Sequence, residues 1–169
     1  VTRGFLSPFR YYGVNDELDY EPIPWRPGKF VEADLTAAVS TDARATQALR
    51  ELRRHGPGCR RVLAFCCSTA HADFTARWLR EHGVSSLAVH SGPTSAPRTP
   101  SLERFRAGEV EVLCAVDVFN EGLDVPLVDA VLMLRPTESP VIFLQQLGRG
   151  LRRAEGKDAK VVQEFVPGS

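Results

Sequence analysis

The chain has 169 residues, of which 43% are hydrophobic and 25% are charged. This composition is typical of a globular protein and excludes disordered, collagen-like and fibrous classes, and the length suits one ordinary domain. The 21 Lys and Arg residues balance the 21 Asp and Glu residues. That balance argues against a surface built as a whole to bind nucleic acid, although a local basic patch can still do so. Because no apolar run reaches the roughly 18 residues of a membrane span, we expect no membrane partner.

The cysteines favour a reducing compartment. Cys66 and Cys67 are adjacent, Cys59 and Cys114 stand alone, and no C-x-x-C pair occurs. This pattern favours buried core thiols over metal ligands, and we expect a cytoplasmic protein without a metal site. The chain begins with Val1 and not with Met, so we expect it to be a piece of a longer polypeptide.

The N-terminal third differs in composition from the rest. Residues 21–28 are rich in Pro, which predicts an extended linker, and a helix is expected after them. The apolar face of that helix carries Ala45, Ala48, Leu49 and Leu52. Residues 55–57 (His-Gly-Pro) end it. We therefore expect an N-terminal linker and leading helix over residues 1–57, and a domain over residues 58–169.

Short apolar runs alternate with helical patterns from residue 61 onward. The expected strands are residues 61–67, 86–90, 110–116, 130–134 and 160–166. Several of them are apolar almost throughout, as strands are when helices cover both faces of a parallel sheet. Alternation of strands and helices with short loops predicts an α/β fold with a parallel sheet.

Three helices are predicted between these strands. The first begins after Ser68 and ends at Gly83. The second has Thr99 as its N-cap and Pro100 as its first helical residue. The third follows the same start signal and covers residues 140–153.

The third helix carries candidate phosphate-binding residues. Gln145, Arg149 and Arg152 are spaced to share one face. Gly148 and Gly150 remove side chains beside the arginines, so that a ligand or another backbone can approach. Guanidinium forks at this spacing suit phosphate recognition, although a solvated basic face fits the spacing as well.

A second candidate segment, residues 117–126, directly follows the third expected strand. Ligands bind beyond the carboxyl ends of the strands in sheets of this kind. The segment contains Gly122 and Asp124. Asp124 could accept a hydrogen bond from a sugar hydroxyl or orient an arginine, and an ordinary turn is the alternative interpretation.

Together these segments resemble the C-terminal RecA-like domain of superfamily 2 helicases, the DEAD/DEAH-box-like ATP-dependent enzymes. Residues 117–126 are similar to motif V, and residues 145–152 (QQLGRGLR) are similar to motif VI. Residues 63–68 look like motif IV, and residues 90–92 (HSG) look like the loop after the next strand. Residues 5–14 resemble, less specifically, the connector of the restriction-enzyme-subunit-like group. The resemblance implies a RecA-like three-layer sandwich with a mostly parallel sheet and helices on both faces.

The resemblance also implies roles for single residues. Arg149 and Arg152 would be catalytic arginine fingers on the phosphates of ATP, which is held with Mg²⁺ mainly by an N-terminal RecA-like domain of the same polypeptide. Gly122 and Asp124 would contact the ribose side of the nucleotide, and Gln145 would face the partner domain. The track for nucleic acid would be lined by Ser68, Thr69, His90, Ser91, Gly92, Val116 and Asp117. Such contacts to a DNA or RNA backbone are not sequence-specific.

A complete helicase also needs a G-x4-G-K-[ST] phosphate loop. The Gly-Lys pairs at Gly28 and Gly156 are followed by Phe and Asp, so the fragment alone is expected to be inactive. One alternative is a non-catalytic RecA-like module that binds nucleic acid or acts as a scaffold, but the retained arginines and Asp124 argue against it. The other is an unrelated α/β nucleotide-binding enzyme, and the lack of a Gly-rich loop after the first strand argues against that.

Overall fold

The computed structural model describes residues 9–16, 25–26, 29–30, 32–56, 58–116, 128–135 and 160–167, with side chains described for residues 33–56, 58–116 and 128–135. In chain order the elements are β1 (Phe9–Asp16), β2 (Trp25–Arg26), β3 (Lys29–Phe30), α1 (Glu32–Val39), α2 (Asp42–His55), β4 (Val62–Phe65), α3 (Thr69–Glu81), β5 (Ser86–Ala88), α4 (Arg98–Arg106), β6 (Val112–Ala115), β7 (Ala130–Met133) and β8 (Lys160–Pro167). No helix among these described residues is long and apolar enough to cross a membrane.

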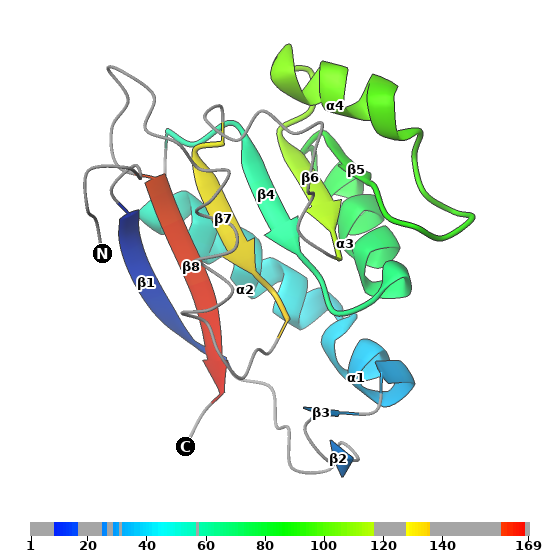
Figure 1. Ribbon diagram of the computed structural model, residues 1–169. Coiled ribbons are helices and arrows are strands. Elements are labelled where there is room, and N and C mark those ends of the chain that lie inside the picture. Colours follow the sequence, from blue (N-terminus) through cyan, green and yellow to red (C-terminus); the bar gives the residue numbers. More distant parts are fainter. Residues whose placement is uncertain are drawn as a thin grey trace.

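A six-stranded sheet in the order β1-β8-β7-β4-β6-β5 forms the centre of the molecule (Figure 1). All of its strand pairs are parallel. The short strands β2 and β3 form a separate antiparallel pair. The expected α/β fold with a parallel sheet is confirmed, and each of the five expected strands lies at the predicted place in the chain.

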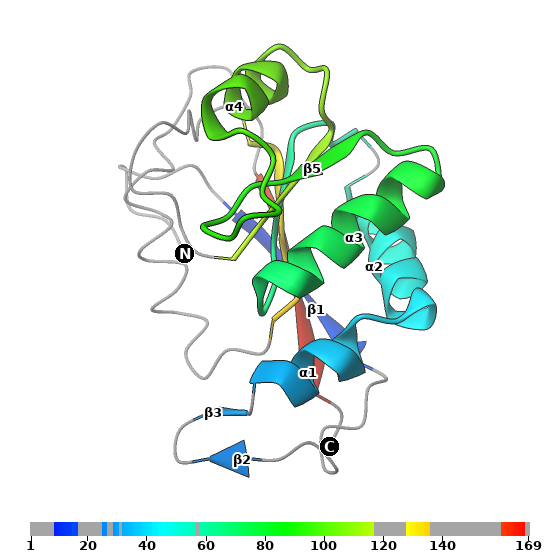
Figure 2. The same ribbon diagram turned by 90° about the vertical axis from the view of Figure 1, so that its right-hand side faces the viewer.

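Both faces of the sheet are covered, because successive residues of a strand point to opposite faces. Val62 and Ala64 on β4 belong to one core cluster, which includes Leu52 of α2 and Leu79 of α3. Phe65, also on β4, belongs to a second cluster with residues of α4. Figure 2 shows α2 and α3 together on one side of the sheet. The helices therefore form layers on both sides of the strands.

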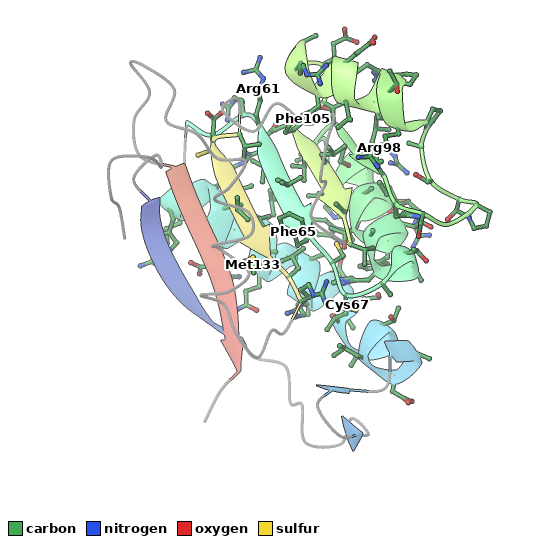
Figure 3. All side chains as sticks on the ribbon, viewed as in Figure 1. Arg61, Phe65, Cys67, Arg98, Phe105 and Met133 are labelled. Carbon is green, nitrogen blue, oxygen red and sulfur yellow. The ribbon has the colours of Figure 1, made fainter. Side chains whose placement is uncertain are left out.

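The second cluster packs under α4. Phe105 of α4 is 1% exposed and belongs to the same core cluster as Phe65 of β4 and Met133 of β7, which lie further along the strands (Figure 3). Leu102, one turn earlier on α4, belongs to the same cluster. These contacts hold α4 against the face of the sheet that α2 and α3 leave free.

The predicted helix boundaries hold for α3 and differ for α4. The Ser68 side chain caps the start of α3. After its end, Gly83 has a φ of 82°, a left-handed conformation that favours glycine. The N-cap of α4 is Pro97 and not Thr99, and it makes no side-chain cap hydrogen bond. Pro100 therefore lies within the first turn of α4. Backbone N–H groups there have no partner within the helix, so the helix can begin before this proline.

Residues expected as linker and leading helix contribute to the same sheet and core. The leading helix is present as α2, from Asp42 to His55. Strand β1 was not expected, and it pairs with β8 from Phe9 opposite Lys160 to Asp16 opposite Pro167. Helix α1 was not expected either. The boundary placed at residue 58 thus separates α2 from the β-strands on which it packs.

Candidate nucleic-acid interface

The strands end together at one edge of the sheet, which is where the candidate residues were expected. The backbone N–H of Cys66 donates to the carbonyl of Ala115 at 2.7 Å, beyond the ends of β4 and β6. The N–H of Leu134 donates to Phe65 and that of Val89 donates to Cys114, both at 2.9 Å. The segments that follow β4, β5, β6 and β7 therefore start from a common carboxyl edge.

The segment after β4 begins α3. The hydroxyl oxygen of Ser68 accepts a 3.2 Å hydrogen bond from the backbone N–H of His71, which is the bond of an N-cap. The same hydroxyl is hydrogen-bonded to Thr36 of α1, and Ser68 is 5% exposed. Thr69, the first residue of α3, is partly exposed. Thus the hydroxyl of Ser68 joins α1 to α3, and Thr69 lies at the surface beside it.

The segment after β5 is organised around the ring of His90. Its Nδ1 atom accepts a 3.0 Å hydrogen bond from the backbone N–H of Gly92, and its Nε2 atom lies 2.8 Å from Oδ1 of Asp73. Because Nδ1 accepts the hydrogen bond from Gly92, we assign the neutral ring the tautomer with its proton on Nε2. That N–H donates to Asp73. Only 1% of the His90 side chain is exposed. Ser91, between His90 and Gly92, is exposed.

Gly92 brings the segments after β4 and β5 together. A Cβ atom added at Gly92 would lie 3.1 Å from Nδ1 of His90 and 3.5 Å from Cγ2 of Thr69. The first distance is tighter than ordinary van der Waals contact, so a side chain here would displace the ring. Three of the residues predicted from the resemblance, on two separate segments, are therefore neighbours.

Val116 follows β6 and is partly buried. Its carbonyl accepts a 2.8 Å hydrogen bond from Nη1 of Arg135. Since Arg135 follows β7 and β4 lies between β7 and β6, the Arg135 side chain reaches across the end of β4. Arg135 directly follows the apolar run of residues 130–134, and no role was predicted for it from the sequence.

The nucleotide-facing candidates and one residue of the expected nucleic-acid track lie outside the described residues. These are Asp117 from the expected track, together with Gly122, Asp124, Gln145, Arg149 and Arg152. Within the part of the chain that the structure describes, no three His, Cys, Asp or Glu side chains gather in a way that could hold a metal ion. None of the four cysteines forms a disulfide bond; Cys59, Cys66 and Cys114 are buried, and Cys67 is partly buried.

A buried histidine supports the turn between β4 and α3. His71 is 2% exposed, and its Nδ1 accepts a 3.1 Å hydrogen bond from the backbone N–H of Cys67. Burial, together with the positive charge of Arg44, lowers the pKa of His71 to about 3. The ring is therefore neutral at physiological pH, and it acts as a hydrogen-bond acceptor that shapes the segment containing Ser68 and Thr69.

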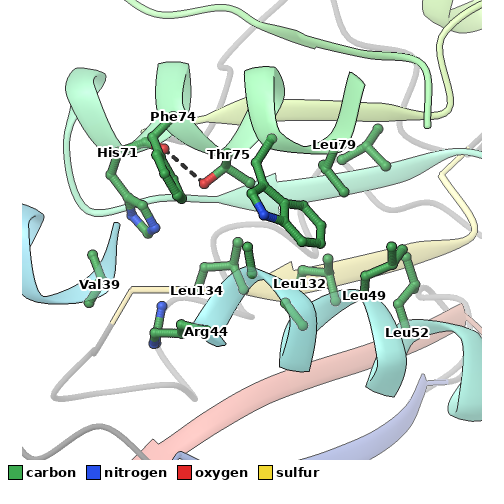
Figure 4. A pocket seen from close by; sticks show the side chains of 14 residues that line it. Val39, Arg44, Leu49, Leu52, His71, Phe74, Thr75, Leu79, Leu132 and Leu134 are labelled. Atoms are coloured by element: carbon green, nitrogen blue, oxygen red, sulfur yellow. Dashed lines mark hydrogen bonds between the residues drawn. The ribbon is translucent and has the colours of Figure 1, made fainter. Parts of the chain in front are cut away.

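His71 and Arg44 also line a small cavity between α2, α3 and the sheet (Figure 4). The cavity measures about 20 Å³, which is room for about one water molecule. Most of its lining is apolar, as with Leu49, Leu52 and Leu79. It is a gap in the core and too small for a nucleotide or a base.

Comparisons with known proteins agree on one family. The helicase conserved C-terminal domain family matches residues 44–154. The chain is 26% identical over 167 residues to the putative ATP-dependent helicase IRC3 of Saccharomyces cerevisiae, covering 98% of this chain and 24% of that protein. It is 33% identical over 157 residues to the ATP-dependent RNA helicase dbp3 of Aspergillus terreus, covering 92% of this chain and 32% of that protein. Its structure is similar to a fragment of a putative HsdR subunit of a type I restriction enzyme from Vibrio vulnificus YJ016, with a TM-score of 0.66 and 25% sequence identity. The similarity covers 96% of this chain and 32% of that chain. The chain thus spans between about a quarter and a third of the length of these proteins.

Proposed function

Because the chain belongs to the helicase conserved C-terminal domain family of superfamily 2, we propose that it acts as the second RecA-like domain of an ATP-dependent nucleic-acid helicase or translocase. One observation carries the proposal. The family match covers residues 44–154, which contain both the 117–126 and the 145–152 segments. A likeness of the strands and helices alone would support the fold and leave the activity open.

The ATP-facing half of the proposal rests on the sequence of the two motif segments. Arg149 and Arg152 would act as arginine fingers, which stabilise the charge that develops on the phosphates during phosphoryl transfer. Gly122 and Asp124 would contact the ribose side of ATP, and Gln145 would face the N-terminal RecA-like domain of the same polypeptide. That domain would hold most of the Mg²⁺-bound nucleotide, since this chain contains no phosphate loop. ATP then binds between two domains, so that its hydrolysis can be coupled to their closure and opening.

The nucleic-acid half of the proposal is supported by the geometry of the carboxyl edge. Thr69 and Gly92 are so close that a Cβ atom added at Gly92 would touch Thr69, and Ser91, the residue before Gly92, is exposed. Hydroxyl groups and backbone N–H groups at the start of a helix suit a phosphate, because the helix dipole favours negative charge there. We therefore place the backbone of a DNA or RNA strand along this edge, bound without regard to base sequence.

The arginine fingers are tested in the full-length protein. We expect Arg149→Ala to lower the nucleic-acid-stimulated ATPase rate by about a thousandfold or more, which is the effect of removing an arginine finger. Arg153→Ala is the matched control, because it removes a neighbouring positive charge outside the motif and should keep most of the activity. Circular dichroism spectra of both variants check that folding is intact. An unchanged rate for Arg149→Ala would refute the finger role.

The 169-residue chain alone provides the second test. We expect no ATPase activity above background from it, with or without nucleic acid, because it lacks a phosphate loop. If the full-length protein binds nucleic acid but hydrolyses no ATP, the chain is instead a non-catalytic RecA-like binding or scaffolding module. The cytoplasmic location expected from the cysteines remains a prediction.

A further inference from the structure

We propose that Asp73 and His90 are positioning residues, which hold the loop of residues 90–95 in the shape that contacts a nucleic-acid phosphate. This inference rests on the proposed function, because it assigns the supports of the same interface. It concerns Asp73 on α3, a residue that the motifs do not include, and it gives His90 an indirect role in place of the direct contact expected from the resemblance. The loop lies at the carboxyl edge, directly after β5.

The carboxylate of Asp73 links α3 to two points of the loop. Its Oδ1 atom lies 2.8 Å from Nε2 of His90, and its Oδ2 atom accepts a hydrogen bond from the hydroxyl of Thr94. Asp73 follows Thr69 by four residues on α3, so the two side chains share one face of that helix. One carboxylate therefore sets the distance between the start of α3 and the whole loop.

His90 transmits this constraint to the backbone of the loop. While Nε2 faces Asp73, Nδ1 accepts the N–H of Gly92 at 3.0 Å. The backbone N–H of His90 donates to the hydroxyl of Ser95 at 2.9 Å, and the N–H of Ser95 donates to the carbonyl of Gly92 at 3.2 Å. The loop is thus closed on itself around the imidazole.

The ring of His90 is unsuited to bind a phosphate itself. Its side chain is 1% exposed, and both ring nitrogens have partners within the chain. The groups that the loop leaves at the surface are those of Ser91 and Thr94, which are exposed. A phosphate would therefore meet Ser91 and the backbone beside Gly92, and the order of that backbone depends on His90 and Asp73.

Asp73→Ala and Asp73→Asn separate this role from the charge of Asp73. Alanine removes both hydrogen bonds to the loop. Asparagine keeps an acceptor for Nε2 of His90, and its amide can donate to the hydroxyl of Thr94, which also accepts hydrogen bonds. We expect Asp73→Ala to weaken binding of a fluorescein-labelled single-stranded oligonucleotide by about tenfold. This is the size of effect expected when the displaced loop loses one well-placed hydrogen bond to a charged phosphate. We expect Asp73→Asn to restore most of the affinity.

His90→Asn and His90→Gln test the other link. An Asn side chain places its amide oxygen near the position of Nδ1 and can still accept from Gly92. A Gln side chain reaches toward Asp73 and leaves the N–H of Gly92 without that acceptor. Because the bond to Gly92 shapes the loop, we expect His90→Asn to bind the oligonucleotide more tightly than His90→Gln.

The assay uses the full-length protein, with DNA and RNA versions of the oligonucleotide. Glu81→Ala is the matched control, since it removes an exposed carboxylate from the far end of α3 and should leave the affinity unchanged. The KM for ATP and the melting temperature are also measured for every variant. Across the series, we expect neither of them to follow the affinity for the oligonucleotide. If wild-type protein binds neither oligonucleotide, the proposed function fails. If wild type binds and Asp73→Ala binds equally well, or if Asp73→Ala and Asp73→Asn lose affinity equally, the positioning role is overturned.

Discussion

The ring of His71 accepts a hydrogen bond at Nδ1 from the backbone N–H of Cys67, over a distance of 3.1 Å. This bond requires a neutral imidazole, because a protonated Nδ1 would point a second N–H at the first. Burial and the nearby Arg44 keep the ring neutral, with a pKa lowered to about 3. The turn that presents Ser68 and Thr69 thus depends on the protonation state of a residue that does not reach the surface.

The first prediction is that acid destabilises the folded chain through His71. The pKa of His71 is about 3 in the folded state, against an ordinary value of 6.5 for histidine. Between these values the unfolded state binds more protons, so stability falls as the pH is lowered below about 6.5. We expect the free energy of unfolding at pH 5 to be about 2 kcal/mol lower than at pH 7 from this group alone. Urea denaturation at the two pH values measures the difference.

His71→Asn isolates the contribution of this histidine. The amide oxygen can accept the N–H of Cys67, and the new side chain does not titrate. The variant should therefore lose about 2 kcal/mol less than wild type between pH 7 and pH 5. Equal losses in the two proteins would show that another group causes the acid sensitivity.

The second prediction concerns the hydroxyl pair between α1 and α3. Ser68→Ala removes the N-cap of α3 and the partner of Thr36, and we expect it to lower the free energy of unfolding by about 1–2 kcal/mol. Thr36→Val removes only the partner and should cost less, about 0.5–1 kcal/mol. Because both changes break the same bond, the double variant should be little less stable than Ser68→Ala.

Chemical denaturation of the two single variants and the double variant forms a thermodynamic cycle for this pair. Thr99→Val is the control, since Thr99 is exposed on α4 and its change should stay within about 0.5 kcal/mol. Strictly additive effects of Ser68→Ala and Thr36→Val would contradict the hydrogen bond between them.

Local patterns predicted the centre of the fold better than its borders. Residues 62–65, 112–115 and 130–133 lie within apolar runs, and each is buried along its full length. Because both faces of such a strand are buried, all of its positions are apolar, and the strand can be recognised from a run of only a few residues. By contrast, β1 pairs with β8, more than a hundred positions away. The local pattern of residues 9–16 does not show which distant strand will pair with them.

The same distinction applies to the candidate interface. Ser68 precedes a helical pattern and was identified as the start of a helix, because a cap acts on residues three positions away. The link between Asp73 and His90 joins residues 17 positions apart and exists because α3 packs beside β5. Spacing along the chain gives no sign of it. The supports of a site are therefore harder to predict from sequence than the residues that a motif names.

The third prediction tests whether α4 covers the second face of the sheet. Phe105 is 1% exposed and belongs to the core cluster that also contains Phe65 and Met133. We expect Phe105→Ala to lower the free energy of unfolding by about 3–5 kcal/mol, because it leaves a cavity in that cluster. Glu103→Ala on the exposed side of the same helix is the control and should cost less than about 0.5 kcal/mol. Urea denaturation of the two variants makes the comparison. A small effect for Phe105→Ala would mean that α4 contributes little to the core.

The fourth prediction concerns the boundary near residue 58. A fragment of residues 58–169 lacks Leu52 and Ala48 of α2, which are 1% and 6% exposed in the core beneath that helix. Removing them uncovers the sheet face that α2 shares with α3, so we expect this fragment to show no cooperative urea transition and to bind a hydrophobic dye. A fragment of residues 17–169 loses β1 together with the residues before it and should keep a cooperative transition, since α2 and α3 stay in place. It should also self-associate, because β8 then becomes an edge strand with unpaired backbone groups. Cooperative unfolding of the 58–169 fragment at the stability of the whole chain would instead establish residue 58 as the start of the folding unit.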